Sequence, residues 1–529
     1  MTLRLPNLPN LALRCSLALT LITLGFSSLP SVYAQDESKA EKKEEEKKSD
    51  KPAVEMGKIE TDKDSTEPKQ QGNTFDSEIS LAGQKIPFAA AVKSIVVTTD
   101  DGKSKATIFY TEYLKKDVAE SSKRPITFCF NGGPGSSSIW LHIGGLSPKK
   151  INFQPNELMP ETYSLDDNPD SLFDLTDLVF IDPVLTGYSR PEKEDEKTKF
   201  LGLENDIQSV GEFIRLYLTK SGRWNSPMYI LGESYGGIRG PGLAHYLYDR
   251  HYIATTGLIL VSPVVDFQTL SASMSNDLPY VLFLPSFAAT AWHHHKTDPD
   301  LGSDLPAFVK EVEKFALGKY STALHKGDSL SNKQKEAIAE TMSGMIGLSK
   351  DYILRANLKI SMSRFGKELL REKGEVIGRY DGRFKAPSWD GNNANAEFDP
   401  SGALVGPGFA ASLRQYFFDS FKLRNEESYE ILSGKVRPWA YNSENRYVEL
   451  SPRLRQTIYE VPNMKVFIAC GYMDLATPYM GVHHTINHLG LPKAYEKRIT
   501  YGHYPAGHMM YIEKQSQSDL KKDLSSFYK

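Results

Sequence analysis

The 529-residue sequence predicts an α/β fold with a mostly parallel central sheet and an inserted, largely helical cap. Short apolar runs alternate with helical stretches in two parts of the chain, and this alternation is typical of a parallel sheet covered by helices on both faces. Between Val261 and Lys465, by contrast, there is no clear strand of such a sheet. Because structureless loops of that length are rare in compact domains, we expect an inserted domain there.

Residues 1–34 have the pattern of a secretory signal peptide. Two arginines accompany an apolar run from Cys15 to Phe26, and small residues precede a cleavage site after Ala34. The run is too short to span a bilayer, and no later apolar run approaches that length. We therefore expect an exported protein without a membrane span, periplasmic or extracellular after cleavage.

Residues 35–74 are expected to form a disordered tether. They contain nine Lys, twelve Asp or Glu and no aromatic residue, so they cannot bury enough apolar surface to offset the entropy of ordering. The whole chain has a formal net charge of −3. A near-neutral body without a basic stripe argues against nucleic acid as a partner.

The remaining elements are predicted from periodicity and turn residues. A hairpin comes first, with strands Ser94–Thr99 and Ala106–Leu114 around a turn at Asp101-Gly102. The later strands are expected at Ile126–Phe130, Leu178–Ile181, Met228–Leu231, Gly257–Val261, Lys465–Ala469 and Lys497–Tyr501. The helices between them are expected at Glu204–Leu218, Tyr235–Asp249, Pro478–His488 and Lys514–Phe527.

These elements divide the body into a core in two parts, residues 75–264 and 461–529, and a helical cap insertion at 265–460. Within the insertion, the best helical patterns are Asn332–Leu348 and Asp351–Lys373. We expect the insertion to lie above the C-terminal ends of the strands.

The most informative motif is Gly232-Glu233-Ser234-Tyr235-Gly236, which follows a strand and opens a helix. In such an elbow the serine hydroxyl is held clear of the backbone, and the glycines permit a sharp, crowded turn. The context predicts Ser234 as a nucleophile.

A second motif, Asn131-Gly132-Gly133-Pro134-Gly135-Ser136, also follows a strand. Its glycines let backbone amides face a developing negative charge, so the amides of Gly133 and Tyr235 are predicted to form an oxyanion hole. The competing interpretation, a phosphate-binding loop, lacks the GKS, GKT or GxGxxG pattern.

Asp474 and His508 complete a candidate triad because each follows one of the last two predicted strands. The chain order Ser, Asp, His is that of α/β-hydrolases. The rival histidine, His503, lacks the AGHM context of His508. Asp182 precedes the nucleophile, which breaks the hydrolase order, so we expect it to be structural or to line the site.

The sequence resembles the serine carboxypeptidase family in segments spread over residues 125–510. The matching segments are NGGPGSSS (131–138), VFIDPVLTGYSR (179–190), LGESYGG (231–237), ACGYMD (469–474) and AGHMM (506–510). The resemblance implies the triad Ser234, Asp474 and His508, an acyl-enzyme on Ser234, and peptide substrates with a free C-terminus. It further implies that Asn131 and Glu233 bind the substrate's terminal carboxylate.

Glu233 beside a substrate carboxylate is a like-charge pair, which is costly unless the two groups share a proton. Activity is therefore expected to favour acidic pH. The chain departs from the family pattern at Cys129, Ser136 and Gly145, where many members have tryptophan, cysteine and glutamate. These departures keep open an acyltransferase or esterase that uses the same triad. A non-catalytic surface binding protein is a weaker alternative, because the triad and both oxyanion donors are present.

No metal or cofactor is expected. The His293-His294-His295 run has only nearby aspartates and no cysteine, and His484 and His488 lack an intervening HExxH glutamate. Cys129 and Cys470 are expected to be free thiols on non-neighbouring strands. The sequence makes no prediction of the oligomeric state.

Overall fold

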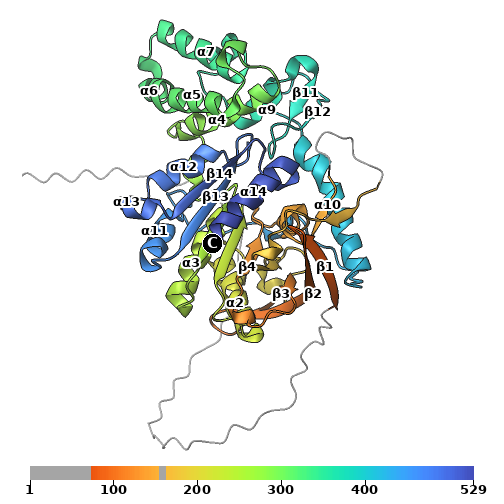
Figure 1. The fold of residues 1–529 in the computed structure, drawn as a ribbon. Helices are drawn as coiled ribbons and strands as arrows, with labels where there is room; N and C mark the ends of the chain where they lie inside the picture. The colour runs from red at the N-terminus through yellow and green to blue at the C-terminus, as the bar shows by residue number, and fades with distance from the viewer. Residues whose placement is uncertain (1–72, 154–161) are drawn as a thin grey trace, which may run out of the picture. The chain divides into compact units, whose positions relative to one another are not determined.

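A ten-stranded mixed sheet forms the centre of this computed structural model, which describes residues 73–153 and 162–529 (Figure 1). The strand order is β1-β2-β3-β7-β4-β9-β10-β13-β14, with β8 paired beside β3. The strands are β1 (Asn73–Leu81), β2 (Gln84–Thr98), β3 (Lys105–Lys115), β4 (Ile126–Phe130), β7 (Asp177–Ile181), β8 (Arg190–Pro191), β9 (Met228–Glu233), β10 (Gly257–Val261), β13 (Lys465–Gly471) and β14 (Ile499–Tyr504).

All strand pairs from β7-β4 to β13-β14 are parallel, whereas the pairs β1-β2, β2-β3 and β3-β7 are antiparallel. The predicted fold class is confirmed. The hairpin prediction is correct but incomplete, because β2 begins ten residues earlier than Ser94 and pairs with an additional strand, β1. The first six residues of β1 contain no buried side chain, which explains its weak apolar signal.

Signal peptide and tether fall in the part of the chain that the structure does not describe, except for Asn73 and Thr74. These two residues, predicted as the end of the tether, begin β1 instead. Among the described residues, none of the helices combines the length and apolarity needed to cross a bilayer.

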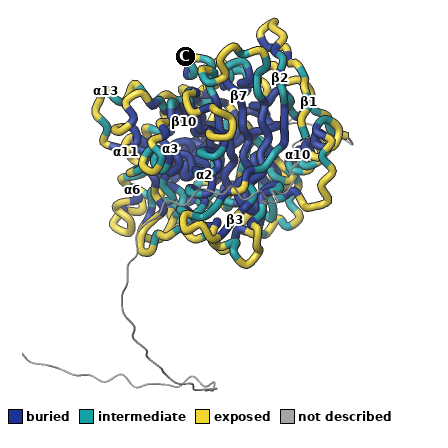
Figure 2. Tube along the Cα trace, turned by 90° about the horizontal axis from the view of Figure 1, so that it is seen from below, coloured by how far each residue is buried: buried dark blue, intermediate teal, exposed yellow. Residues whose placement is uncertain are grey.

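Side chains of the central strands alternate between two hydrophobic clusters, one on each face of the sheet. In β4, for example, Ile126, Phe128 and Phe130 belong to one cluster and Cys129 to the other. The first cluster includes helices α2 (Leu203–Ser221), α3 (Gly236–His251) and α11 (Ser451–Glu460), and the second includes α10 (Pro400–Asp419) and α14 (Lys514–Phe527). Figure 2 shows the central strands of the sheet in the dark blue of buried residues.

Residues 262–464 connect β10 to its sheet neighbour β13 and add no strand to the large sheet. Their helices, several of them at the top of Figure 1, are α4 (Leu278–His293), α5 (Leu305–Phe315), α6 (Ser321–Lys326), α7 (Asn332–Ile346), α8 (Lys350–Arg355), α9 (Met362–Glu368), α10 and α11. A short hairpin of β11 (Glu375–Ile377) and β12 (Lys385–Pro387) accompanies them.

One helical prediction in this insertion is wrong. The stretch Asp351–Lys373 is not one helix but is divided into α8, α9 and a 3-10 turn. Asn357 and Leu358 both have positive φ, which ends α8, and the Ser361 side chain caps the next helix by accepting from Arg364 N. Helix α7, by contrast, begins where predicted, with a capping box at Ser331.

The remaining short elements lie around the sheet. They are α1 (Ile139–Leu141), a π-helical turn at His142–Leu146, β5 (Lys149–Ile151), β6 (Leu165–Asp167), α12 (Tyr479–Asn487) and α13 (Lys493–Glu496).

Candidate active site

The predicted nucleophile lies in a strained turn between β9 and α3. Ser234 has φ +63°, a left-handed conformation that is uncommon for residues other than glycine. The turn is held by Ser234 N, which donates to Val261 O at 3.0 Å, and by Gly237 N, which donates to Ser234 O at 2.8 Å. Strain that the surroundings enforce is characteristic of functional sites.

The loop after β4 packs directly on this turn. A Cβ at Gly132 would lie 2.3 Å from Tyr235 N and 2.6 Å from Glu233 O, so no side chain fits there. Gly133 has φ +105°. Among the turn and loop hydrogen bonds of the described chain, none is donated by the amide of Gly133 or of Tyr235. Both amides are therefore available to an oxyanion.

Gly132→Ala is expected to lower kcat by about 10²–10³-fold, because the added methyl group pushes the two candidate oxyanion donors apart. The matched control is Gly434→Ala, since a Cβ at Gly434 has no heavy atom within 4 Å and this residue lines the same cavity. Steady-state kinetics of both folded variants test this. Equal activity of the two variants would contradict the close approach.

Asp474 and His508 meet beyond the ends of β13 and β14. His508 Nδ1 lies 2.7 Å from Asp474 Oδ2, and both residues are buried. Asp474 Oδ1 accepts hydrogen bonds from two backbone amides, those of Ala476 and Thr477. The carboxylate is thereby fixed where it can orient the imidazole. His503, the rival histidine, bonds to His483 instead, through their Nε2 atoms at 2.9 Å.

Thr477 was missed by the sequence analysis. Its Oγ1 lies 2.8 Å from Asp474 Oδ2, 2.8 Å from Ser262 O and 3.1 Å from His508 Nδ1. The Ser262 hydroxyl donates to the carbonyl of His508. Two hydroxyl side chains thus anchor the acid and the base, although a lone threonine in sequence carries no signal for such a role.

Opposing effects act on the pKa of His508. Burial of the ring acts to lower it, but attraction to Asp474, the hydrogen bond to that carboxylate and the charge of Glu233 raise it above its ordinary value. An imidazolium at this position is stabilised, as a general base requires once it has taken a proton.

One cavity of about 730 Å³ brings together Ser234, His508, Glu233, Asn131 and Gly133. Within the described residues, the hydrogen bonds of His508 are made by Nδ1 and the backbone, and none joins Nε2 to the Ser234 hydroxyl. Nε2 lies 4.0 Å from Glu233 Oε1, so this edge of the ring faces the elbow. In unliganded enzymes such catalytic hydrogen bonds are often long.

The predicted carboxylate-binding residues lie at a buried end of this cavity. Glu233 and Asn131 are each 2% exposed. Burial raises the pKa of Glu233 to about 7, against the opposing effects of His508 and of hydrogen bonds from Tyr511 and Asn131. A neutral carboxyl group is therefore accessible under mildly acidic conditions.

Tyr511 is a second residue that sequence reasoning missed. Its hydroxyl donates to Glu233 Oε2 at 2.6 Å, and its ring packs against Gly144 and Gly145. A Cβ at Gly145 would lie 2.5 Å from Tyr511 Cβ, so the tyrosine leaves no room for a side chain at this position, one of the departures from the family pattern noted above. No motif includes Tyr511, which lies just beyond the AGHMM segment.

Tyr511→Phe is expected to raise the pKa of Glu233 further, because it removes a hydrogen bond that stabilises the carboxylate. The neutral carboxyl then persists to higher pH, and the alkaline decline of kcat/KM for free-acid substrates moves upward. The control is Tyr504→Phe, whose hydroxyl bonds to Asp523 away from the cavity. An unchanged pH profile in Tyr511→Phe, or the same shift in both variants, would contradict this assignment.

Arg239, on α3, connects the turn at Ser234 to the loop that follows β4. Its guanidinium donates to Asp206 and to the carbonyl of Asn131, and it stacks on the rings of Phe130 and Tyr235. Arg239 and Asp206 are both buried. The buried ion pair holds the start of the loop after β4, at Asn131, against α3.

The chain is similar in sequence to known proteins. The family model described as serine carboxypeptidase matches residues 95–369, which include Gly133 and Ser234. Serine carboxypeptidase-like 9 of Arabidopsis thaliana is 25% identical over 180 residues, 32% of this chain and 39% of the relative. Serine carboxypeptidase S10 family member 1 of Dictyostelium discoideum is 26% identical over 168 residues, 30% of this chain and 37% of the relative. The aligned regions thus cover well under half of these relatives.

The chain also resembles the crystal structure of Kex1ΔP, a prohormone-processing carboxypeptidase from Saccharomyces cerevisiae. The TM-score is 0.52 at 15% identity, over 83% of this chain and 91% of that chain. At this identity the similarity concerns the fold, which is that of the α/β-hydrolases. This similarity of fold agrees with the family match over residues 95–369. The chain belongs to the serine carboxypeptidase family.

Proposed function

We propose that this protein is a serine-type carboxypeptidase that releases C-terminal residues from peptides. Ser234 Oγ attacks the carbonyl carbon of the last peptide bond while His508 Nε2 takes its proton. The imidazolium then gives that proton to the leaving amine, and an ester on Ser234 remains. Water, deprotonated by His508, hydrolyses the ester and restores the serine. The amides of Gly133 and Tyr235 stabilise the oxyanion in both steps.

The observation that carries this proposal is the buried Glu233, next in sequence to the nucleophile and in the same cavity. Hydrolysis of a simple ester does not require a buried glutamate beside the nucleophile. Beside Asn131 and Tyr511 it forms a hydrogen-bonding group that suits a terminal carboxylate, provided that one carboxyl group is protonated.

The same geometry supports activity at acidic pH. Glu233 is neutral below its raised pKa of about 7 and can then share its proton with the substrate. Loss of the Glu233 charge also removes one of the effects that raise the pKa of His508. Protonation of Glu233 therefore favours substrate binding, and it lowers the pKa of His508, so that the imidazole loses its proton at a lower pH.

N-blocked dipeptides with free or amidated C-termini, compared across pH, test this function. The free-acid substrate is expected to have the higher kcat/KM at acidic pH, and its advantage should fall as pH rises through about 7. Equal kcat/KM for both substrates at every pH would contradict the carboxypeptidase assignment.

An acyltransferase or esterase is the second candidate, favoured by the packing of Tyr511 at Gly145. This packing leaves no room for a side chain at position 145, so the second carboxyl group that the family resemblance implies there is absent from the predicted carboxylate site. Partition of the acyl group between water and an added alcohol or amine distinguishes the candidates. Transfer that dominates over hydrolysis at low acceptor concentration would favour the acyltransferase.

Export and domain organisation are part of the proposal. We infer that cleavage after Ala34 delivers the protein to the periplasm or the cell exterior, with 35–74 as a tether, which N-terminal sequencing of the mature protein tests. We also assign residues 265–460 as a cap over the two-part core. Arg379 and Tyr380 from this segment line the cavity, and Tyr380 O accepts from His508 N at 2.6 Å, which supports the cap.

A further inference from the structure

A cluster of Cys470, His483 and His503 lies outside the cavity described above. The thiol and one ring nitrogen of each histidine all lie within 4.8 Å of one another. Cys470 is on β13 and His503 is its register partner on β14, while His483 comes from α12. Three elements thus direct one potential metal ligand each to a common point, although the residues are separated in sequence.

The two histidines face each other through nitrogen atoms that a metal could use. His483 Nε2 and His503 Nε2 are 2.9 Å apart, so one ring must donate a proton to the other when no ion is bound. Ligand atoms in a tetrahedral zinc site lie about 3.3–3.6 Å apart, given Zn–N and Zn–S bonds of about 2.0–2.3 Å. To bind an ion, the two ring nitrogens must therefore move slightly apart, and the thiol and the rings, whose ligand atoms lie within 4.8 Å of one another, must approach by about 1 Å at most.

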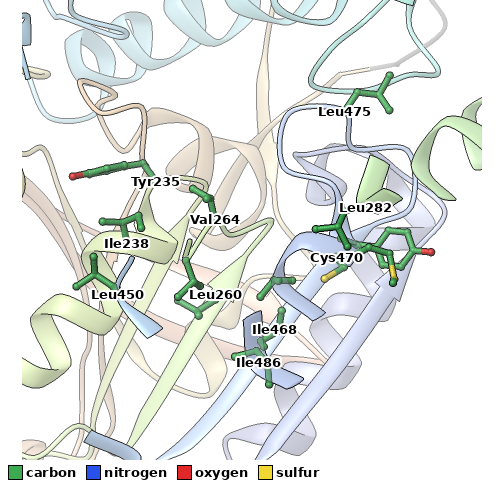
Figure 3. Close-up of a cluster of buried hydrophobic side chains, with 14 of the residues drawn as sticks. Tyr235, Ile238, Leu260, Val264, Leu282, Leu450, Ile468, Cys470, Leu475 and Ile486 are labelled. Carbon is green, nitrogen blue, oxygen red and sulfur yellow. The ribbon is translucent and has the colours of Figure 1, made fainter. Parts of the chain in front are cut away.

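Aromatic neighbours hold these rings in place. Tyr472 stacks on His503, Tyr479 meets both histidines edge-on, and Tyr501 packs on His483. The thiol side is closed, since Cys470 is 1% exposed and Figure 3 shows it among Leu282, Ile468 and Ile486. Both histidines are only partly buried, which leaves a route for an ion and a water molecule.

We propose that Cys470, His483 and His503 form a binding site for a transition-metal ion such as Zn²⁺. One thiolate and two imidazoles are a ligand set of the kind that zinc prefers, and water completes a four-coordinate site. Binding displaces the thiol proton, and each histidine keeps a proton on Nδ1. No carboxylate is in the cluster, which disfavours Mg²⁺ and Ca²⁺.

The site has a structural consequence for the two strands that carry the triad acid and base. Cys470 lies near the end of β13, four residues before Asp474. His503 lies near the end of β14, five residues before His508. An ion therefore links α12 to β13 and β14, the two strands that lead to Asp474 and His508. The site does not depend on the proposed peptidase activity, so its test does not require a substrate.

The test uses the purified full-length protein, treated with chelator and then titrated with Zn²⁺ or Co²⁺ alone. Equilibrium dialysis is expected to give one Zn²⁺ per chain. Co²⁺ is expected to produce a thiolate charge-transfer band and the strong visible absorption of a tetrahedral site. Zn²⁺ is also expected to raise the Tm, because it binds only the folded chain.

Three single variants are expected to weaken Zn²⁺ binding by at least about tenfold: Cys470→Ser, His483→Gln and His503→Gln. The control is His488→Gln, an exposed histidine directly after α12, which should bind like the parent protein. Absence of a thiolate charge-transfer band in the parent protein, or unchanged Zn²⁺ affinity in folded His483→Gln, would overturn the proposal. The spectrum of the parent protein decides the matter even where a variant does not fold.

Discussion

Ser234→Ala is expected to lower kcat by about 10⁴–10⁶-fold and to abolish covalent labelling by a fluorophosphonate. The hydroxyl at the elbow is the only group of the candidate triad that forms the acyl-enzyme, so no neighbour replaces it. Folding should be retained, because alanine removes a single oxygen atom. Peptide hydrolysis assays and labelling followed by mass spectrometry measure both effects.

A matched control for this variant is Ser136→Ala. Ser136 lines the same cavity, but its hydroxyl bonds to the carbonyl of Ser137 and belongs to no triad. Labelling should persist in Ser136→Ala and disappear in Ser234→Ala. Labelling that survives in Ser234→Ala would show that the nucleophile lies elsewhere, and the assignment of Asp474 and His508 would fall with it.

Glu233→Gln is expected to remove most of the pH dependence of binding for free-acid peptides. The glutamate shares a proton with the substrate only while its own carboxyl is neutral, so affinity is present below about pH 7 and is lost as pH rises through the raised pKa. Glutamine stays neutral at every pH. The shared hydrogen bond is worth about 1.5–3 kcal/mol, which is about tenfold to over a hundredfold in affinity. Inhibition constants of a free-acid product analogue across pH measure it.

Two comparisons isolate the effect of Glu233. Amidated analogues bring no second charge, so their affinity should change little in Glu233→Gln. Glu112→Gln provides a matched variant, because Glu112 is also buried and accepts from a tyrosine, Tyr217, but lies away from the cavity. An unchanged pH dependence in Glu233→Gln would exclude Glu233 as the carboxylate receptor and would advance the esterase or acyltransferase.

Much of the fold follows from local pattern, because each buried parallel strand is a short apolar run bounded by turns. Strands β4 and β10 and helix α14 have the predicted bounds. Prediction from hydrophobic periodicity failed where few side chains of a strand are buried, as in β1 at the edge of the sheet. It also failed at Asn357 and Leu358, because left-handed backbone in residues other than glycine has no strong sequence signal.

The candidate site was predictable in so far as its residues sit in motifs at strand ends. Ser234, Asp474 and His508 lie in such motifs, and the structure brings Asp474 and His508 into contact. Thr477 and Tyr511 were not predictable, because their role depends on packing between segments that are distant in sequence. The cluster at Cys470 was hidden for the same reason: its histidines are 20 residues apart and meet only when α12 packs beside β14.

Mass spectrometry of an N-blocked synthetic peptide incubated with the protein at mildly acidic pH tests the proposed carboxypeptidase activity. We expect a ladder of products shortened one residue at a time from the C-terminus, and we expect the amidated form of the same peptide to be consumed far more slowly. Ser234→Ala should give no ladder. Internal cleavage of the peptide, or an intact free-acid peptide under conditions in which a simple ester is hydrolysed, would show that the protein is not a carboxypeptidase.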